Sequence, residues 1–185
     1  FEGKPQINIP SIIGASSKKP ILIRIATTGQ RPIEYEAKDL PKGIYLNDNI
    51  LQGTIANDGE YQITLIAKNA LGRNEKKIIL EIKDQNVLIT PLLGFTTWNA
   101  FESAITQEDV EGIATRLVDL GITEYGYSYV NTDSGWQGEY GGKHDAIMPN
   151  KKFPDMRKMT DKIHSYGLKC GIYSTPMLNA WGCPN

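Results

Sequence analysis

The sequence predicts a multidomain chain that combines an all-β part with an α/β part. Over residues 1–88, short runs of alternating apolar and polar residues are separated by turn signals about every 8–12 residues, which is typical of a β-sandwich. After residue 88 the apolar period changes from two residues to about 3.6, and the elements follow in the order β-α-β-α-β. This order, with right-handed crossovers, builds a parallel sheet. We place the two domains at residues 1–86 and 87–185.

In the first domain, several segments have an apolar side chain at every second position, which predicts strands with one buried face. Shorter strands are expected around residues 21–26 and 50–55, with turns at residues 47–49 and 57–59. Two longer strands are joined by a hairpin loop and carry these inward-facing side chains: Tyr61, Ile63, Leu65 and Ala67, then Ile78, Leu80 and Ile82.

Four short motifs mark the turns and one core position of this domain: Leu40-Pro41-x-Gly43, Gly53-Thr54, Gly59-x-Tyr61 and Ala67-x-Asn69. With these motifs, residues 40–72 resemble the He-PIG (cadherin-like) modules of bacterial surface and secreted proteins. The resemblance implies an Ig-like β-sandwich. Two roles are open for such a module, namely adhesion to carbohydrate or protein, and a rigid spacer that packs on its neighbour. We favour the spacer, because no cluster of exposed aromatic residues stands out.

The second domain contains three strand patterns, around residues 92–98, 127–133 and 168–173. Thr106 is placed to cap the first intervening helix, with Asp109 as its partner in a capping box. The second helix begins after a Phe-Pro-Asp segment at residues 153–155. Apolar side chains three or four residues apart predict the inward faces of the two helices: Val110, Ile113, Ala114, Leu117 and Leu120, then Met156, Met159 and Ile163.

The stretch YSYVNTDSGWQ, residues 127–137, begins as a buried strand and ends in polar residues. Asp133 and Ser134 bring hydrogen-bonding groups to the carboxyl end of that strand, where ligands of α/β sheets bind, and Trp136 adds an apolar ring. This combination suits a sugar, because a carboxylate accepts hydroxyl hydrogens while a ring covers the apolar C–H face. The alternative is an ordinary turn, in which Asp, Ser and Gly are also frequent.

Four segments carry a more specific resemblance: residues 89–101 (ITPLLGFTTWNAF), residues 127–137, residues 150–173 and the tail with Cys183. In this order and spacing they resemble the start of the barrel in the melibiase-type α-galactosidases, glycoside hydrolase family 27 and its relatives. The resemblance implies a (β/α)8 TIM barrel whose sugar site lies at the carboxyl ends of the strands. This chain would contain only the first β/α units, so that the barrel is incomplete.

The resemblance also implies site residues. Trp98, Asp133 and Tyr173 would line the sugar pocket at the ends of the three strands, and Trp136 would shape its wall. Ser134 stands where the family has a second acid, so it keeps a hydrogen bond but loses a negative charge. For Trp98 and Tyr173, ordinary packing at the rim of a barrel is the alternative.

The activity implied by the resemblance is that of a retaining exo-glycosidase for α-galactosides or related sugars. In the family the nucleophilic aspartate ends the fourth strand and the acid/base aspartate ends the sixth. We therefore expect both beyond Asn185, no catalytic residue in this chain, and no activity of this fragment alone; Cys183 would pair with a cysteine further along. The alternative is a non-catalytic carbohydrate-binding or adhesion protein on a degenerate barrel, which Ser134 and the missing acids favour.

Composition argues against several other classes of function. The net charge is −1, without the basic excess that nucleic-acid binding requires. No apolar run approaches the roughly 20 residues of a membrane span, and we expect neither a metal nor a cofactor. The chain begins FEGKPQ, without Met or an apolar signal segment, so we expect a processed or trimmed form. The resemblances imply export from a bacterium, to the periplasm, the cell surface or the medium.

Overall fold

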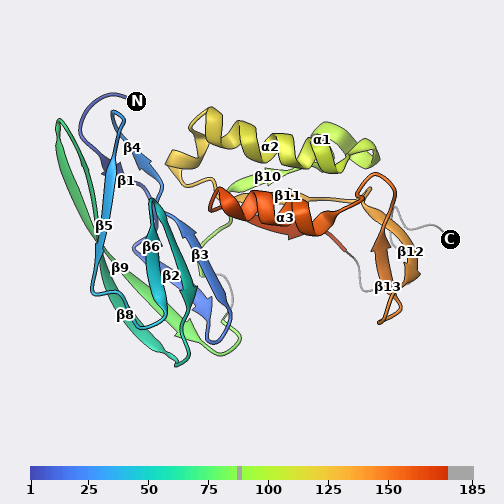
Figure 1. Cartoon of the computed structure of the whole chain (residues 1–185), viewed down its shortest axis with the longest axis horizontal. Coiled ribbons are helices and arrows are strands. Elements are labelled where there is room, and N and C mark those ends of the chain that lie inside the picture. Colours follow the sequence, from blue (N-terminus) through green and yellow to red (C-terminus); the bar gives the residue numbers. More distant parts are fainter. Residues whose placement is uncertain (87–88, 175–185) are drawn as a thin grey trace. The chain divides into compact units, whose positions relative to one another are not determined.

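The computed structural model describes residues 1–86 and 89–174 of the chain (Figure 1). Two compact units make up the fold. The first contains residues 1–92 together with residues 121–127, and the second contains residues 93–120 and continues from residue 128. The chain therefore passes from one unit to the other three times.

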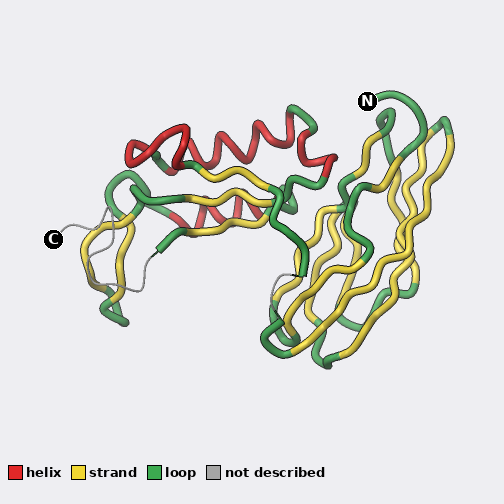
Figure 2. Tube along the Cα trace, turned by 180° about the vertical axis from the view of Figure 1, so that it is seen from behind, coloured by secondary structure: helices red, strands yellow, loops and turns green. Residues whose placement is uncertain are grey.

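The first unit is a β-sandwich (Figures 1 and 2). One sheet has the order β2-β9-β8-β5, with β2 and β9 parallel and the other neighbours antiparallel; the second sheet is antiparallel, in the order β3-β7-β6. A short antiparallel pair joins β1 to β4. The strands are β1 (Gln6–Ile7), β2 (Ile12–Ser16), β3 (Pro20–Arg24), β4 (Thr27–Thr28), β5 (Glu34–Lys38), β6 (Ile44–Asn47), β7 (Ile50–Thr54), β8 (Gly59–Asn69) and β9 (Gly72–Lys83).

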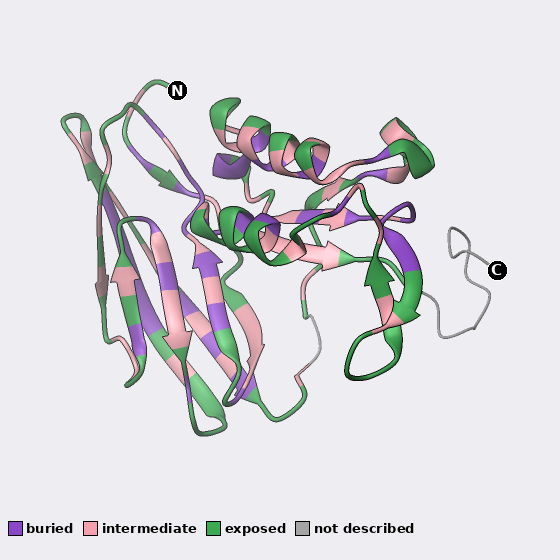
Figure 3. Cartoon of the chain, turned by 45° about the vertical axis from the view of Figure 1, so that its right-hand side comes forward, coloured by how far each residue is buried: buried purple, intermediate pink, exposed green. Residues whose placement is uncertain are grey.

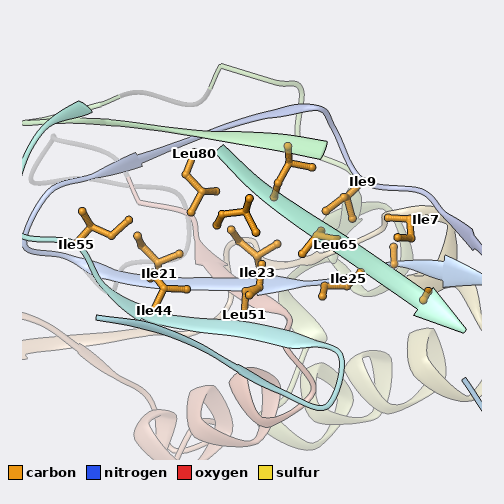
Figure 4. Packing of buried hydrophobic residues seen from close by; sticks show 14 of the residues in the cluster. Ile7, Ile9, Ile21, Ile23, Ile25, Ile44, Leu51, Ile55, Leu65 and Leu80 are labelled. Atoms are coloured by element: carbon orange, nitrogen blue, oxygen red, sulfur yellow. The ribbon is translucent and has the colours of Figure 1, made fainter. Parts of the chain in front are cut away.

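The core of this unit lies between the two sheets, where Leu65 of β8 and Leu80 of β9 pack in one cluster with Ile21, Ile23 and Leu51 of the facing sheet (Figure 4). Each buried Ile or Leu contributes about 1.5–3 kcal/mol relative to an exposed position. Figure 3 shows the resulting alternation of buried and exposed residues along the strands. The predicted sandwich, with one buried face on each sheet, is confirmed, while the finer Ig-like assignment stays a prediction.

Two glycines, Gly43 directly before β6 and Gly53 within β7, allow the backbones of these neighbouring strands to approach closely. Gly43 and Gly53 have φ angles of +95° and +139°, and the N–H of Thr54 donates to the carbonyl of Gly43 at 3.0 Å. A Cβ added to Gly53 would lie 1.9 Å from the Gly43 carbonyl oxygen. Only glycine fits there, which explains in physical terms why both glycines belong to the turn motifs.

The segment at residues 121–127 completes the first unit and contains the short 3₁₀ helix η2 (Ile122–Tyr125). Glu124 is only 4% exposed. Its carboxylate accepts from Arg24 at 2.6 Å, lies 3.1 Å from the Arg31 guanidinium, and accepts from the backbone N–H of Thr27 at 3.0 Å. The side chain of Asn8 donates to the Glu124 carbonyl at 2.9 Å. Four strands or loops of the sandwich therefore hold this segment.

The second unit is built on a parallel sheet in the order β10-β11-β14, with strands Gly94–Thr96, Tyr129–Thr132 and Lys169–Ile172. Helix α2 (Gln107–Asp119) precedes β11, and α3 (Met156–Ser165) precedes β14. The helices contact each other and the sheet, as Figures 1 and 2 show. The predicted β-α-β-α-β order and parallel sheet are confirmed, while the complete barrel stays a proposal.

The helices begin where the sequence predicts. Thr106 and Asp109 form the capping box at the start of α2, in which the Thr106 hydroxyl accepts from the Asp109 N–H at 3.2 Å and the Asp109 carboxylate accepts from the Thr106 N–H at 2.9 Å. Asp155 caps α3 by accepting from the N–H of Lys158 at 2.9 Å. Of the predicted inward residues, Val110, Ala114, Leu117, Met159 and Ile163 are buried, whereas Ile113 and Met156 are half-buried.

Three expectations about local structure are wrong. Leu120 is 65% exposed, because α2 ends at Asp119 and Leu120 no longer continues the helical face. The first strand ends at Thr96, so Trp98 begins the short helix α1 (Trp98–Phe101), which η1 (Glu102–Ala104) follows. The second strand begins only at Tyr129, and Tyr127 is 38% exposed.

The sequence analysis also missed a β-hairpin between β11 and α3. Its strands are β12 (Gln137–Gly141) and β13 (Ala146–Pro149), which pair antiparallel with an irregular register between Gln137 and Tyr140. This hairpin directly follows the turn that contains Asp133 and Trp136, so it bears on the geometry of the candidate site.

Candidate functional site

The three parallel strands end at the same edge of the sheet. Thr96, Asn131 and Gly171 are in register, and two backbone hydrogen bonds continue the ladder beyond the strands. The N–H of Thr97 donates to the Asn131 carbonyl at 3.1 Å, and the N–H of Tyr173 donates to the Thr132 carbonyl at 2.8 Å. The residues that follow the three strands are therefore held level with one another.

Asp133 follows β11 directly, and its backbone is fixed by a neighbouring strand end. Its N–H donates to the hydroxyl of Thr97 at 3.0 Å, and Thr97 is completely buried. One carboxylate oxygen, Oδ1, accepts from the N–H of Ser134 at 2.8 Å. Within the residues that the structure describes, Oδ2 accepts no hydrogen bond, so a half-buried acceptor is left for a ligand at this edge.

Trp136 connects the turn after β11 with the end of β14. Its indole N–H donates to the Tyr173 carbonyl at 2.9 Å, and the side chain is nearly buried, at 7% exposure. A buried indole whose polar atom is satisfied is a rigid wall rather than an open stacking surface. That Trp136 shapes the wall of a sugar pocket stays a prediction.

Ser134 and Gly135 form the tight part of the turn. Ser134 is 3% exposed, so its hydroxyl is enclosed by protein. Gly135 has a φ angle of +111°, and a Cβ there would lie 2.9 Å from the Ser103 carbonyl oxygen. A larger residue at Gly135 would push the turn away from η1, and the positions of Asp133 and Trp136 would change with it.

The remaining two predicted site residues border the same edge. Trp98 is half-buried at the start of α1, next to Thr97, and Tyr173 is 39% exposed after β14. Within the described part of the chain, no hydrogen bond or ring stacking links the Trp98 side chain to Asp133 or Tyr173. Hydrogen bonds thus join Asp133 to Ser134 and Trp136 to Tyr173 at this edge, and Trp98 follows the end of the first strand.

Other chemical groups of interest lie away from this edge or outside the described residues. The thiol of Cys170 is half-buried in β14, and its burial raises its pKa, which disfavours the reactive thiolate form. The predicted role of Cys183 lies outside the described residues.

Across residues 1–86 and 89–174 there is no cluster of three or more His, Cys, Asp or Glu side chains that could hold a metal ion. In the same residues no helix is long and apolar enough to cross a membrane.

A protein-family model matches the part of the chain that contains this edge. The family model described as Alpha galactosidase A matches residues 90–183, about half of the chain. The chain belongs to the alpha-galactosidase family. Among curated proteins, Probable alpha-galactosidase B of Talaromyces emersonii is 43% identical over 89 residues, which are 46% of this chain and 20% of that protein. Alpha-galactosidase A of Cellvibrio japonicus is 36% identical over 94 residues, which are 50% of this chain and 23% of that protein.

A solved structure extends the similarity of this alpha-galactosidase-family chain to both units. The crystal structure of a "putative alpha-galactosidase" (BF1418) from Bacteroides fragilis is 39% identical with a TM-score of 0.89, and the match covers 94% of this chain. It covers 38% of that solved chain. The present chain thus spans about a fifth of the length of the curated relatives and less than two fifths of the solved one.

Within the alpha-galactosidase-family unit, sequence reasoning missed two residues that hold the site. Thr97 fixes the backbone of Asp133, and Asn150 bonds the turn around Gly135, with donor–acceptor distances of 2.8–3.0 Å. Thr97 lies 36 residues before Asp133, and Asn150 lies 15 residues after Gly135, so no local pattern joins these pairs. The one feature of the sequence that pointed to Thr97 was the pair Thr96-Thr97 at the end of a predicted strand.

Proposed function

We propose that this chain is part of a retaining exo-glycosidase of the α-galactosidase type. It supplies an Ig-like sandwich and the first β/α units of a (β/α)8 TIM barrel, with the domain boundary near residues 86 and 87. The observation that carries the proposal is the group at the carboxyl edge of the sheet, where Thr97 fixes Asp133 and Trp136 bonds to the end of β14. Family membership makes a sugar the best ligand for that group.

In this proposal, each site residue has a role that its geometry supports. The Oδ2 atom of Asp133 accepts hydrogen bonds from sugar hydroxyls. Trp98 and Tyr173 border the apolar C–H face of the sugar ring. Trp136 keeps the two strand ends at a fixed distance. Ser134 stands where a second carboxylate is expected in the family, which lowers the negative charge at the site by one, and its enclosed hydroxyl belongs to the turn.

The reaction that we propose is double displacement through a covalent glycosyl-enzyme. It requires two carboxyl groups about 5–5.5 Å apart, one as nucleophile and one as acid/base. Asp133 is assigned to binding, so both catalytic aspartates are expected in the part of the protein beyond residue 185. The short coverage of the relatives supports this expectation. We also propose export from a bacterial cell, supported by the resemblance of the sandwich to modules of surface and secreted proteins.

The binding role is tested with Asp133→Ala in the protein expressed from its complete reading frame. Hydrogen bonds to a charged group are worth about 1.5–3 kcal/mol, so calorimetry with galactose and melibiose should give at least tenfold weaker binding. Asp119→Ala, which removes an exposed carboxylate at the end of α2, is the matched control and should bind within twofold of the wild type. Unchanged affinity in Asp133→Ala would remove Asp133 from the sugar site.

The second candidate is a non-catalytic carbohydrate-binding or adhesion protein, which the serine at position 134 favours. The reading frame beyond Asn185 discriminates between the two candidates. A strand end with the pattern Lys-x-Asp some tens of residues downstream supports the hydrolase. An early stop codon supports the binding protein, because no catalytic pair could then follow.

A further inference from the structure

A single residue from outside the turn, Asn150, binds three consecutive residues of the turn that presents Asp133 and Trp136. The side-chain amide of Asn150 donates to the Gly135 carbonyl at 2.8 Å and to the Gln137 carbonyl at 3.0 Å. Its backbone N–H donates to the Trp136 carbonyl at 2.8 Å. Three successive carbonyl groups are therefore satisfied by one residue at the end of the β12–β13 hairpin.

Asn150 is itself fixed at the start of the segment that leads into α3. Its side-chain oxygen accepts from the N–H of Lys152 at 2.9 Å, and its carbonyl accepts from the N–H of Phe153 at 2.9 Å. Phe153 is completely buried. The position of Asn150 is thus set by the core of the second unit. Through its hydrogen bonds to Gly135, Trp136 and Gln137, Asn150 in turn fixes the position of the turn.

Gln137 completes the arrangement around Gly135. Its side-chain oxygen accepts from the Gly135 N–H at 2.8 Å, and the side chain is 2% exposed. Both polar backbone groups of Gly135 are therefore bound by buried or half-buried amide side chains, one on each side of the turn. Rotation of the Gly135 peptide would break at least one of these hydrogen bonds at low solvent exposure, which favours the observed conformation of the turn.

We propose that Asn150 is a positioning residue of the sugar site, which acts by holding Asp133 and Trp136 in place without touching the sugar. The inference rests on the proposed function. Asparagine suits this role because one planar group offers two N–H donors for the turn and one acceptor for Lys152. Aspartate has the same shape, but its carboxylate would face the carbonyl oxygens of Gly135 and Gln137.

The test uses Asn150→Asp in the complete protein, with calorimetry of galactose binding and a thermal melt. We expect at least tenfold weaker binding at pH 7 while the protein remains folded. Protonation of the new carboxyl removes its charge and restores one donor. The affinity of Asn150→Asp relative to the wild type at the same pH should therefore rise as pH falls toward about 4. Asn150→Ala, which has no group to protonate, should show no such recovery.

Asn57→Asp makes the same chemical change on an exposed turn of the first unit and should bind within twofold of the wild type. If Asn150→Asp does not fold, Asn150→Ser, which keeps one donor, should bind at least threefold more weakly. Wild-type affinity in the folded Asn150 variants, together with weak binding by Asp133→Ala, overturns the positioning role and leaves the proposed function intact. Wild-type affinity in Asp133→Ala overturns the proposed function instead.

Discussion

At the scale of single residues, Gly53 is a position where the backbone leaves room only for hydrogen. Its φ angle is +139°, and a Cβ at this position would lie 1.9 Å from the Gly43 carbonyl oxygen, so both the conformation and the space exclude a side chain. The Gly43 oxygen cannot retreat, because it accepts from the Thr54 N–H at 3.0 Å. A methyl group at Gly53 would separate β6 from β7.

We predict that Gly53→Ala lowers the free energy of unfolding by more than about 2 kcal/mol. Gly112→Ala provides the contrast, because Gly112 lies within α2 and a Cβ there meets no atom within 4 Å. That variant should gain about 0.5–1 kcal/mol. Urea denaturation followed by circular dichroism measures both, and equal stability of the two variants would contradict the close-approach argument.

Also at this scale, the sequence indicated some site residues and could not indicate others. Asp133 was predictable, because its position relative to the end of a buried strand is a local property. The contributions of Thr97 and Asn150 depend on hydrogen bonds that span 36 and 15 residues. Such bonds follow from the packing of strands and hairpin, which no window of the sequence contains.

At the scale of elements, η2 is held by a buried ionic group. Glu124 is 4% exposed, and the Arg24 side chain that faces it at 2.6 Å is 12% exposed. Arg31 and the N–H of Thr27 complete the set of partners of the carboxylate. Removing the carboxylate would leave the Arg24 guanidinium in a low-dielectric environment without its nearest opposite charge.

We predict that Glu124→Ala lowers the free energy of unfolding by about 3–5 kcal/mol. The matched control is Asp161→Ala, which breaks the exposed pair of Arg157 and Asp161 on α3, whose N–O distance is 3.1 Å, and which should change stability little. Thermal melts at low and high salt measure the difference. A melting temperature of Glu124→Ala equal to that of the Asp161 variant would show that the buried group contributes nothing.

Elements with a clear period were predicted well, and the exceptions have physical reasons. The sandwich strands and the faces of α2 and α3 follow from apolar spacing, and the capping box fixed the start of α2. The β12–β13 hairpin was missed because its sequence, QGEYGGKHDAIMP, has five polar or glycine residues in succession at residues 141–145 and no sustained alternation of apolar and polar residues. The strand expected to reach Trp98 stops earlier, because Thr97 turns into α1.

At the scale of the whole molecule, the proposed chemistry exceeds what the site residues of this chain supply. Retaining hydrolysis needs two carboxyl groups, and Asp133 is the one predicted site residue that carries a carboxyl. We predict no measurable hydrolysis of a chromogenic α-galactoside by the isolated 185-residue chain. A full-length family member at equal concentration is the positive control. Turnover comparable to that control would refute the assignment of the catalytic pair to the later sequence.

The segment at residues 121–127 limits how evolution could exchange the two halves of this chain. It lies between α2 and β11 in the sequence but belongs to the sandwich unit. If recombination replaced residues 1–92, the product would keep Glu124 but lose its partners Arg24 and Arg31. The reciprocal product would keep Arg24 and Arg31 but lack Glu124. The sandwich therefore cannot be exchanged by a single crossover at residue 92. An exchange of the whole sandwich unit would also have to include the seven residues 121–127.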